Sequence, residues 1–378
     1  ALKVGAGEGV NGASVLIGKT STSTAAATGV CSPKSLSGLG DAFGICPEAP
    51  SQNGSYLIAG AAYYAHTHRI RSDISIPESD KNSLKVSTYG VQLATNVPRV
   101  KVKVGSGYVT IQPAYRMVLS SGVGTGTIVD FKIISQTDTS GLLYVNWEDS
   151  NQGGDYDQDV NGYIRYDVSG SNITISTRVL GQSTSNPQGF GYIVSGTTKD
   201  GPHFHSGILG FNYTDSYSGI AGCSNCQVGN AETSATYSVG ASSSMALENP
   251  LYYAAKWGGF KDANGDLKPL GLSEWDSKNV DGASGSDGLP DNYFYVNNPG
   301  ALEQALGTAF ANIANEASSS AVGSSSPSLT VGTSLYQAIF SSADWTGDLR
   351  SFSINSSSLV QTLRWSARNK LISPDVAN

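Results

Sequence analysis

Charged residues are scarce in this sequence. They make up 14% of its 378 residues, against roughly 25% in an average soluble protein. The formal net charge is -7, whereas binding to a phosphate backbone needs clustered Lys and Arg side chains that displace counterions. The low and acidic charge therefore argues against nucleic acid as a partner.

Long apolar runs and familiar catalytic motifs are also missing. No stretch of about 18 apolar residues is present, so we expect no transmembrane helix. The sequence has no Gly-x-Ser-x-Gly elbow, no Walker loop and no His-Glu-x-x-His motif, and we do not expect an enzyme. It also lacks an initiator Met, a signal peptide and a lipidation motif, so Ala1 is expected to begin a processed or partial chain.

Glycine, tyrosine and the small hydroxyl residues Ser and Thr are abundant in this sequence. The 45 Gly and 19 Tyr are typical of an extracellular β-rich protein, and the length suffices for about two or three domains. The four cysteines form two local pairs, Cys31 with Cys46 and Cys223 with Cys226, which predict two disulfides. The second pair has CxxC spacing, but the further ligands of a zinc site and the setting of a redox site are not evident.

Alternating apolar residues predict a series of strands in the middle of the sequence. Val100–Val104 alternates strictly, and the turn residues between Val168 and Ile173 predict a hairpin. Together these segments predict an antiparallel sandwich or meander of roughly 110 residues. The expected strands are Leu84–Leu93, Val100–Val104, Ile128–Ile134, Leu142–Trp147, Tyr163–Val168, Ile173–Val179, Phe190–Val194 and Ile208–Tyr213.

Helices are expected on both sides of these strands. Tyr56–His66 has apolar residues at helical spacing, despite Gly60. A second helix is expected to follow Asn298-Pro299, because a capping Asn and a first-turn Pro precede apolar residues at helical spacing. These apolar residues are Leu302, Leu306, Phe310 and Ile313.

The two ends of the sequence give weaker patterns. Residues 1–54 are rich in Gly, Ser, Thr and Ala and predict an irregular region with one short strand, Ser14–Ile17. Residues 318–334 predict a Ser/Gly linker. Beyond the linker, Tyr336–Phe340 and Leu349–Ile354 predict a hairpin with a long turn.

One acidic stretch within the β region predicts a calcium loop. Asp157, Asp159 and Asn161 occupy the first, third and fifth positions of such a loop, with Asp155 adjacent. Val168 stands where an EF-hand has a bidentate Glu, although Glu148 and Asp149 lie upstream. The alternative is that these carboxylates lie in a solvated hairpin loop.

A second acidic stretch lies between Gly258 and Ile313. Its many oxygen donors are separated by glycines, which predicts a loop that either binds calcium or stays mobile. Without an ion, packing alone would have to order the junction between this loop and the helix that follows. The donors are Asp262, Asn264, Asp266, Asp276, Asn279, Asp281, Asp287 and Asp291.

All four histidines occur in His-x-His pairs, His66 with His68 and His203 with His205. Residues two apart on a strand share a face, so His203 and His205 could share a zinc or copper ion. No third ligand stands at a recognisable spacing, and a structural role for both rings is the alternative. His66 and His68 lie at a helix end and do not share a face.

Several segments stand in a recognisable order along the chain. Besides the block from Gly258 to Ile313, they are CSPKSLSGLGDAFGICPE, GSYLIAGAAYYAHTHRIRSD, STYGVQLA, NWEDSNQGGDYDQD, IRYDVSG, NPQGFGYIVSGTTKDG and SLYQAIFSSADWTGDLRSF. Together they resemble the PilY family, the large secreted tip-associated adhesins and biogenesis factors of type IV pili. The resemblance covers most of residues 31–365.

The resemblance implies an α+β fold that is predominantly β. In this family a von Willebrand factor A-like α/β domain precedes a β-propeller. By the resemblance, residues 55–97 and 291–317 would belong to the A-like domain and residues 98–290 would form a β-sandwich-like insertion with acidic loops. Residues 335–378 would begin the propeller. No Asp-x-Ser-x-Ser motif precedes Cys31, so the metal-dependent adhesion site of an A-type domain cannot be assigned.

The implied function is that of an extracellular pilus-tip adhesin and type IV pilus assembly factor. Its partners would be minor pilins and a host or abiotic surface receptor, and Ca2+ would stabilise it. The residues alone leave two other functions open. These are a secreted carbohydrate-binding β-sandwich and a metal-dependent hydrolase that uses His203 and His205.

Overall fold

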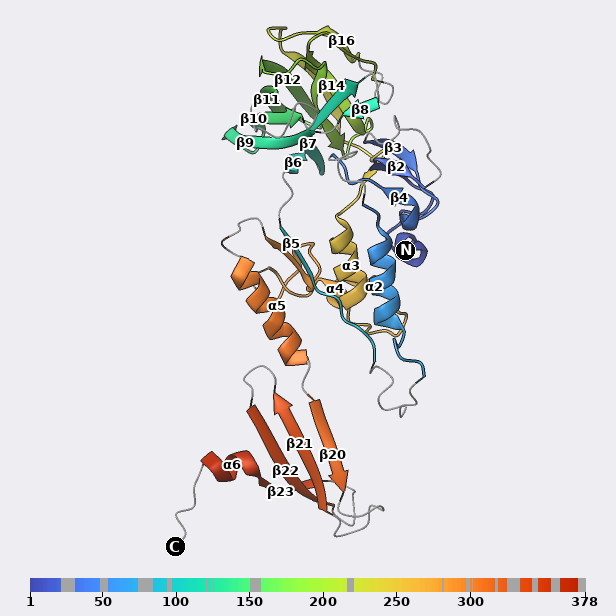
Figure 1. The fold of residues 1–378 in the computed structure, drawn as a ribbon, viewed down its shortest axis with the longest axis vertical. Coiled ribbons are helices and arrows are strands. Elements are labelled where there is room, and N and C mark those ends of the chain that lie inside the picture. The colour runs from blue at the N-terminus through green and yellow to red at the C-terminus, as the bar shows by residue number, and fades with distance from the viewer. Residues whose placement is uncertain are drawn as a thin grey trace. The chain divides into compact units, whose positions relative to one another are not determined.

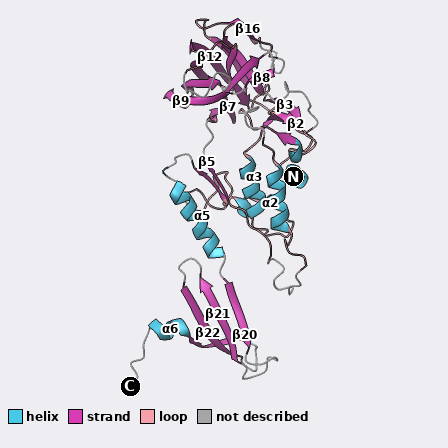
Figure 2. Ribbon diagram, in the orientation of Figure 1, coloured by secondary structure: helices cyan, strands magenta, loops and turns pink. Residues whose placement is uncertain are grey.

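The computed structural model divides into two compact units, Ala1–Tyr295 and Val296–Asn378. Strands outnumber helices in both (Figures 1 and 2). The structure describes residues 1–21, 31–47, 54–73, 84–93, 97–119, 122–124, 126–149, 158–215, 221–280, 282–296, 300, 302–316, 319–324, 334–341, 346–354 and 361–372.

A β-sandwich forms the middle of the first unit. Its sheets have the strand orders β17-β12-β11-β10-β9 and β14-β13-β7-β6, with β8 paired to β7. Neighbouring strands within each sheet are antiparallel. The strands are β6 (Val100–Val104), β7 (Gly107–Leu119), β8 (Gly122–Gly124), β9 (Gly126–Gln136), β10 (Ser140–Asp149), β11 (Val160–Ser169), β12 (Asn172–Gln182), β13 (Gln188–Ser195), β14 (Gly201–Ile208) and β17 (Thr233–Ser238).

The sandwich encloses one apolar core. β6 supplies Val100, Val102 and Val104 from alternate positions, while the two lysines between them are exposed. Trp147 and Tyr166 are among the largest side chains in this core, and both are almost completely buried. The alternation predicted from the sequence therefore corresponds to one face turned inward and one turned to solvent.

β13 and β14 differ from the other strands because all of their residues are buried. One side of this pair faces the sandwich core. On the other side Ile193 and Phe204 belong to a second cluster with Phe211 and both disulfides. This outer layer includes the short antiparallel pair β15 (Phe211–Tyr213) and β16 (Cys223–Cys226).

An α/β body makes up the rest of the first unit. Its core combines residues that precede the sandwich, such as Val15 and Tyr63, with residues that follow it, such as Trp257 and Tyr293. The rings of Tyr63 in α2 and Trp257 in α3 pack edge to face, with their centroids 5.3 Å apart. Its main elements are α1 (Leu2–Gly7), β1 (Ser14–Ile17), β3 (Ser32–Ser35), α2 (Leu57–Thr67), β5 (Gly90–Leu93), β18 (Met245–Ala246), α3 (Pro250–Gly259), α4 (Leu272–Trp275) and β19 (Tyr293–Val296).

Short ladders connect the two halves of the body. β1 pairs with β3 in antiparallel and with β18 in parallel orientation, and β5 pairs with β19. Because both halves contribute to one core, the sandwich is inserted within the sequence of the body rather than appended to it.

The second unit contains one long helix and a small sheet. α5 (Leu302–Glu316) is followed by an antiparallel meander of β20 (Ser319–Ser324), β21 (Ser334–Ser341), β22 (Thr346–Ile354) and β23 (Gln361–Ser366), and then by α6 (Ala367–Ile372). The predicted helix and hairpin are both present. The predicted cap at Asn298-Pro299 lies outside the described residues. Among those residues, no helix is both long and apolar enough to cross a membrane.

Both predicted disulfides form. Cys31 is bonded to Cys46 and Cys223 to Cys226, with Cα atoms 5.6 and 5.8 Å apart. The CxxC pair therefore joins the two ends of β16 covalently.

Residues 1–54 are not irregular throughout, as the sequence pattern predicted. Besides the expected Ser14–Ile17 strand they contain α1, β3 and the short pair β2 (Lys19–Thr20) and β4 (Ala42–Phe43). Elements of two to six residues are too short to give a hydrophobic period, so tertiary contacts alone define them. In the same way β20 occupies part of the predicted 318–334 linker.

The predicted β-insertion 98–290 also extends too far. α3 and α4 follow the sandwich, and their residues Trp257 and Trp275 pack in the core of the body. Seven of the ten residues of α3 are buried, so this helix lacks the polar face that would have revealed it in the sequence.

Two predicted strands are shorter in the structure. The strand expected over Leu84–Leu93 is confined to Gly90–Leu93, and Leu84 itself has a left-handed φ of 63°. The strand expected over Ile208–Tyr213 is broken at Leu209 and Gly210, whose φ values of 54° and 79° form the turn between β14 and β15. A positive φ cannot continue a strand.

The sandwich core yields a direct test with two isoleucines. Ile164 and Ile133 both pair with Leu143, but Ile164 is 0% exposed and Ile133 is 54% exposed. We expect Ile164→Ala to lower the free energy of unfolding by about 2–5 kcal/mol because it leaves a cavity. The control Ile133→Ala should change it by less than about 0.5 kcal/mol. Urea denaturation of the 378-residue chain measures both, and equal losses would contradict the described core.

Candidate metal centres

Two histidines of β14 point into the sandwich. His203 and His205 share one face of the strand, and Phe204 between them packs on the opposite side against Phe211. The ring centroid of His203 lies 4.9 Å from that of Tyr237 and 6.1 Å from that of His205. The predicted sharing of a face is therefore observed, and both imidazoles lie in the protein interior.

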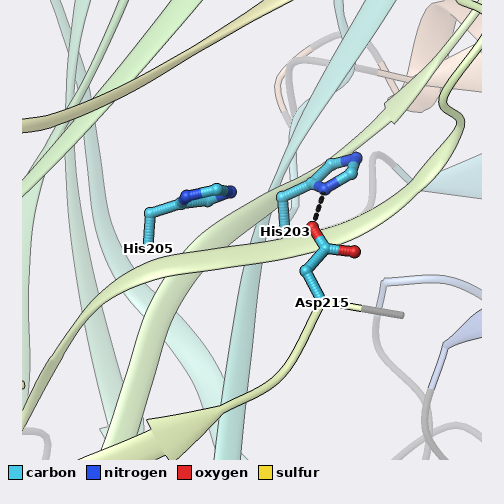
Figure 3. A group of neighbouring side chains, drawn as sticks. All are labelled: His203, His205 and Asp215. Atoms are coloured by element: carbon cyan, nitrogen blue, oxygen red, sulfur yellow. Dashed lines mark hydrogen bonds and ion pairs between the residues drawn. The ribbon is translucent and has the colours of Figure 1, made fainter. Parts of the chain in front are cut away.

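His203 places both ring nitrogens next to oxygen acceptors. Its Nδ1 lies 2.5 Å from Oδ2 of Asp215 (Figure 3). Its Nε2 lies 3.1 Å from the carbonyl oxygen of Lys199. A neutral imidazole carries a single N–H and can satisfy only one of these acceptors. A proton or another cation is needed between Nδ1 and the carboxylate.

His205 contributes a buried nitrogen with no hydrogen-bond partner in the structure. The residue is 6% exposed, and Nε2 has no hydrogen-bond partner among the described residues. Burial, with a smaller contribution from the charge of His203, lowers the pKa of His205 to about 4. The ring is therefore neutral near pH 7, and an unsatisfied buried polar atom costs about 1–3 kcal/mol.

Asp215 was missed in the sequence and completes the group. One donor atom each from His203, His205 and Asp215 lies within 4.8 Å of the other two, and all three residues are buried. Asp215 lies ten positions after His205, and this spacing matches no common metal-ligand motif, so the sequence did not identify Asp215 as a ligand. The available signal was the Leu209-Gly210 turn, which folds β15 and the following Asp215 back along β14.

A second polar cluster lies where β10 ends and β11 begins. Glu148, Asp149 and Asp159 are at most 3% exposed. The backbone N–H of Asp149 donates to Asp159 Oδ2 at 2.5 Å. Asp149 Oδ2 accepts hydrogen bonds from Thr184 Oγ1 at 2.7 Å and Gln188 Nε2 at 2.5 Å. Three of the acidic side chains noted in the sequence are thus buried together rather than solvated.

Amide oxygens border this carboxylate cluster. Asn146 Oδ1 and Gln188 Oε1 are buried and accept no hydrogen bond in the described structure. Burial raises the pKa of the nearby Tyr115 hydroxyl far above its usual value, and the charges of the three carboxylates add to this shift. Oxygen donors of this kind suit a hard cation such as Ca2+.

The predicted ligands of this first loop are only partly described. Asn161 donates from Nδ2 to Gln158 Oε1 at 3.3 Å, and Asp159 belongs to the buried cluster. Asp155 and Asp157 lie outside the described residues. Gln188 and Thr184 were missed, because β13 and the loop before it lie far from β10 in the sequence.

The second acidic loop is held by hydrogen bonds to its own backbone. Asp262 Oδ1 accepts from the N–H groups of Gly265 and Leu267. Asn264 and Asp266 each accept from the N–H group two residues ahead. These are Asx-type turns, which order a Gly-rich loop without an ion.

The later carboxylates of this loop follow the same pattern. Asp276 is 2% exposed and accepts from Ser286 Oγ and from the N–H groups of Asp287 and Gly288. Asp291 accepts from both the N–H and Oγ of Ser277, and Asp287 accepts from the N–H groups of Val280 and Leu289. Asp281 lies outside the described residues. Calcium binding by this loop stays a prediction.

The other His-x-His pair lies at the end of α2. His66 Nε2 lies 2.9 Å from the carbonyl oxygen of Phe260, whereas the His68 ring stacks on Tyr64. His66 also lines an open cavity of about 850 Å3 together with Asp262 and Asn264. The two rings make separate contacts, as expected for a pair that shares no face.

Comparison with known proteins relates the chain to one family. Residues 1–65 match the family described as "PilY1 homolog, second domain", and residues 102–206 match "PilY1 homolog, beta-sandwich". The chain is 28% identical to the type IV pilus biogenesis factor PilY1 homolog of Xylella fastidiosa (strain Temecula1 / ATCC 700964), over 89% of this chain and 25% of that protein. The chain thus spans about a quarter of the length of this relative. No solved structure matches.

The hydrogen bonds of Asp276 can be tested by amide exchange. A hydrogen bond to a charged acceptor contributes about 1.5–3 kcal/mol, so Asp276→Ala should speed exchange at Asp287 and Gly288 by roughly tenfold or more. Asp262→Ala, at the exposed end of the same loop, should leave these two amides unchanged. Hydrogen exchange followed by mass spectrometry gives both rates. Unchanged protection in Asp276→Ala would show that other contacts order the loop.

Proposed function

Because the chain belongs to the PilY1 family, we propose that it is part of an extracellular type IV pilus assembly factor and adhesin that binds minor pilins and a surface receptor at the pilus tip. The observation that carries this function is the similarity over 89% of the chain to a protein named as a type IV pilus biogenesis factor. That similarity includes the sandwich and the elements around it. The role is one of binding rather than catalysis.

Each part of the chain has a place in this function. The α/β body, built from two separated segments, would be part of a von Willebrand factor A-like domain. The meander β20-β21-β22-β23 has the four antiparallel strands of a propeller blade and would be the first of several. The sandwich between the two halves of the body would act as a rigid module that presents a binding surface.

Calcium would stabilise this module at the end of β10. Ca2+ takes six to eight oxygen ligands from carboxylates and amide carbonyls. Among the described residues, Asn146 Oδ1 and Gln188 Oε1 are buried acceptors without a hydrogen bond, and the amide nitrogen of Gln188 contacts the carboxylate of Asp149. Asp155 and Asp157 follow in the sequence and would complete the ligand set. The ion would offset the repulsion among the carboxylates and fix the β10–β11 connection.

Calcium removal tests this stabilisation. At a free Ca2+ concentration one hundred times Kd, binding to the folded state contributes about 2.7 kcal/mol, which corresponds to a rise in Tm of roughly 5–10 °C. We expect this rise in calcium relative to EGTA, and its loss in Asp159→Asn. The control is Asp167→Asn, on the exposed part of β11, which should keep it. Identical melting curves in calcium and EGTA would exclude calcium stabilisation.

Pilus association tests the wider function. The protein that carries this sequence should be found, by antibody against the sandwich, in the sheared pilus fraction of the bacterium that produces it. A strain without the major pilin should lose this signal from the fraction while total cellular protein is unchanged. Recovery only as free protein, equal in both strains, would refute the pilus-tip role.

A further inference from the structure

We propose that His203, His205 and Asp215 bind one zinc ion that joins β14 to the segment after β15 in the interior of the sandwich. The three donors lie within 4.8 Å of one another and come from two separate parts of the chain. This site is distinct from the oxygen-rich cluster at Glu148, Asp149 and Asp159. It would hold whether or not the chain acts at a pilus.

The orientation of His203 is that of a metal ligand. A metal-bound His commonly donates its other N–H to a carbonyl or carboxylate, which fixes the tautomer. Here Nε2 lies 3.1 Å from the carbonyl oxygen of Lys199 and would donate to it in the zinc-bound state. The lone pair is then at Nδ1, the atom that faces Asp215 at 2.5 Å. Two lone pairs at this separation require a cation between them, and a zinc ion would take the place of the proton.

His205 supplies the independent observation. Its Nε2 is buried and has no hydrogen-bond partner, and its ring extends toward the His203–Asp215 pair (Figure 3). A buried nitrogen in such a position gains a bond when an ion binds. The i, i+2 spacing on β14 holds the two imidazoles on the same side of the ion.

The donor set selects the kind of metal. Two imidazole nitrogens and one carboxylate oxygen suit zinc, whereas Ca2+ and Mg2+ prefer oxygen alone. Zinc bonds of about 2.0–2.2 Å place tetrahedral donors roughly 3.3–3.5 Å apart. The Nδ1 to Oδ2 contact would therefore open by about 1 Å as the bridging proton leaves and the ion enters, while the other donors close in.

The surroundings favour a structural site over a hydrolytic one. His203 is 0% exposed, and the hydroxyls of Tyr192 and Tyr237, hydrogen bonded to each other at 2.8 Å, lie on the core side. Three protein ligands leave the fourth position of a tetrahedral zinc ion for a water or another small ligand, as in catalytic sites. In the described part of the chain, however, all three ligands are at most 6% exposed, which favours a structural role.

Metal analysis of the intact 378-residue chain tests the site. The protein is unfolded in urea that contains EDTA to remove bound metal, and it is then refolded with ZnCl2. After desalting, its zinc content is measured by inductively coupled plasma mass spectrometry. We expect about one zinc per chain. His205→Gln and Asp215→Asn should retain less than about a tenth of this amount, because each removes a donor.

Two controls separate this site from other metal binding. His68→Gln changes a histidine of the other pair, and Asp159→Asn changes the proposed calcium cluster. Both should keep the full zinc content. Wild-type protein that holds no zinc after this refolding would overturn the site, as would His205→Gln or Asp215→Asn with the wild-type amount. If a variant does not fold, the site is tested on the wild-type protein alone, by its zinc content and by the visible spectrum of the wild-type protein loaded with Co2+. A spectrum without tetrahedral bands would contradict the site.

Discussion

Complete burial of β13 and β14 is the constraint that determines the chemistry of the sandwich. Core residues cover one side of this strand pair, and β15, β16 and the disulfides cover the other. Every polar side chain on these strands then lies away from water and must be satisfied by the protein or by a bound ion. Gln188, His203 and His205 stand in this position, and each belongs to one of the two candidate metal centres.

The acidic loop after α3 shows how differently carboxylates behave when backbone donors are available. Asp276, Asp287 and Asp291 accept hydrogen bonds from the N–H groups of a Gly-rich segment. These hydrogen bonds order the loop, which contains little regular secondary structure. At the end of β10 the carboxylates are buried, and Asp149 accepts from the side chains of Thr184 and Gln188 rather than from a series of backbone N–H groups. The contrast favours the β10–β11 connection over this loop as the place for calcium.

The sequence predicted those parts of the fold that have one buried and one exposed face. Val100–Val104 and Ser14–Ile17 were predicted with the bounds that the structure shows. β14 and α3 were missed because an element covered on all sides has no polar face and so no period, although Phe190–Val194 was predicted within the equally buried β13. The His203/His205 pair was visible as a motif. Asp215 was not, because the turn at Gly210, rather than a fixed spacing, brings it to the histidines.

The central claim is that the polar groups buried in the sandwich are satisfied by a metal ion, and anomalous diffraction tests it most directly. Crystals of the zinc-refolded chain would be measured on both sides of the zinc absorption edge. The account predicts one peak among His203 Nδ1, His205 Nε2 and the Asp215 carboxylate. An empty position, with His203 and Asp215 still at hydrogen-bond distance, would contradict it.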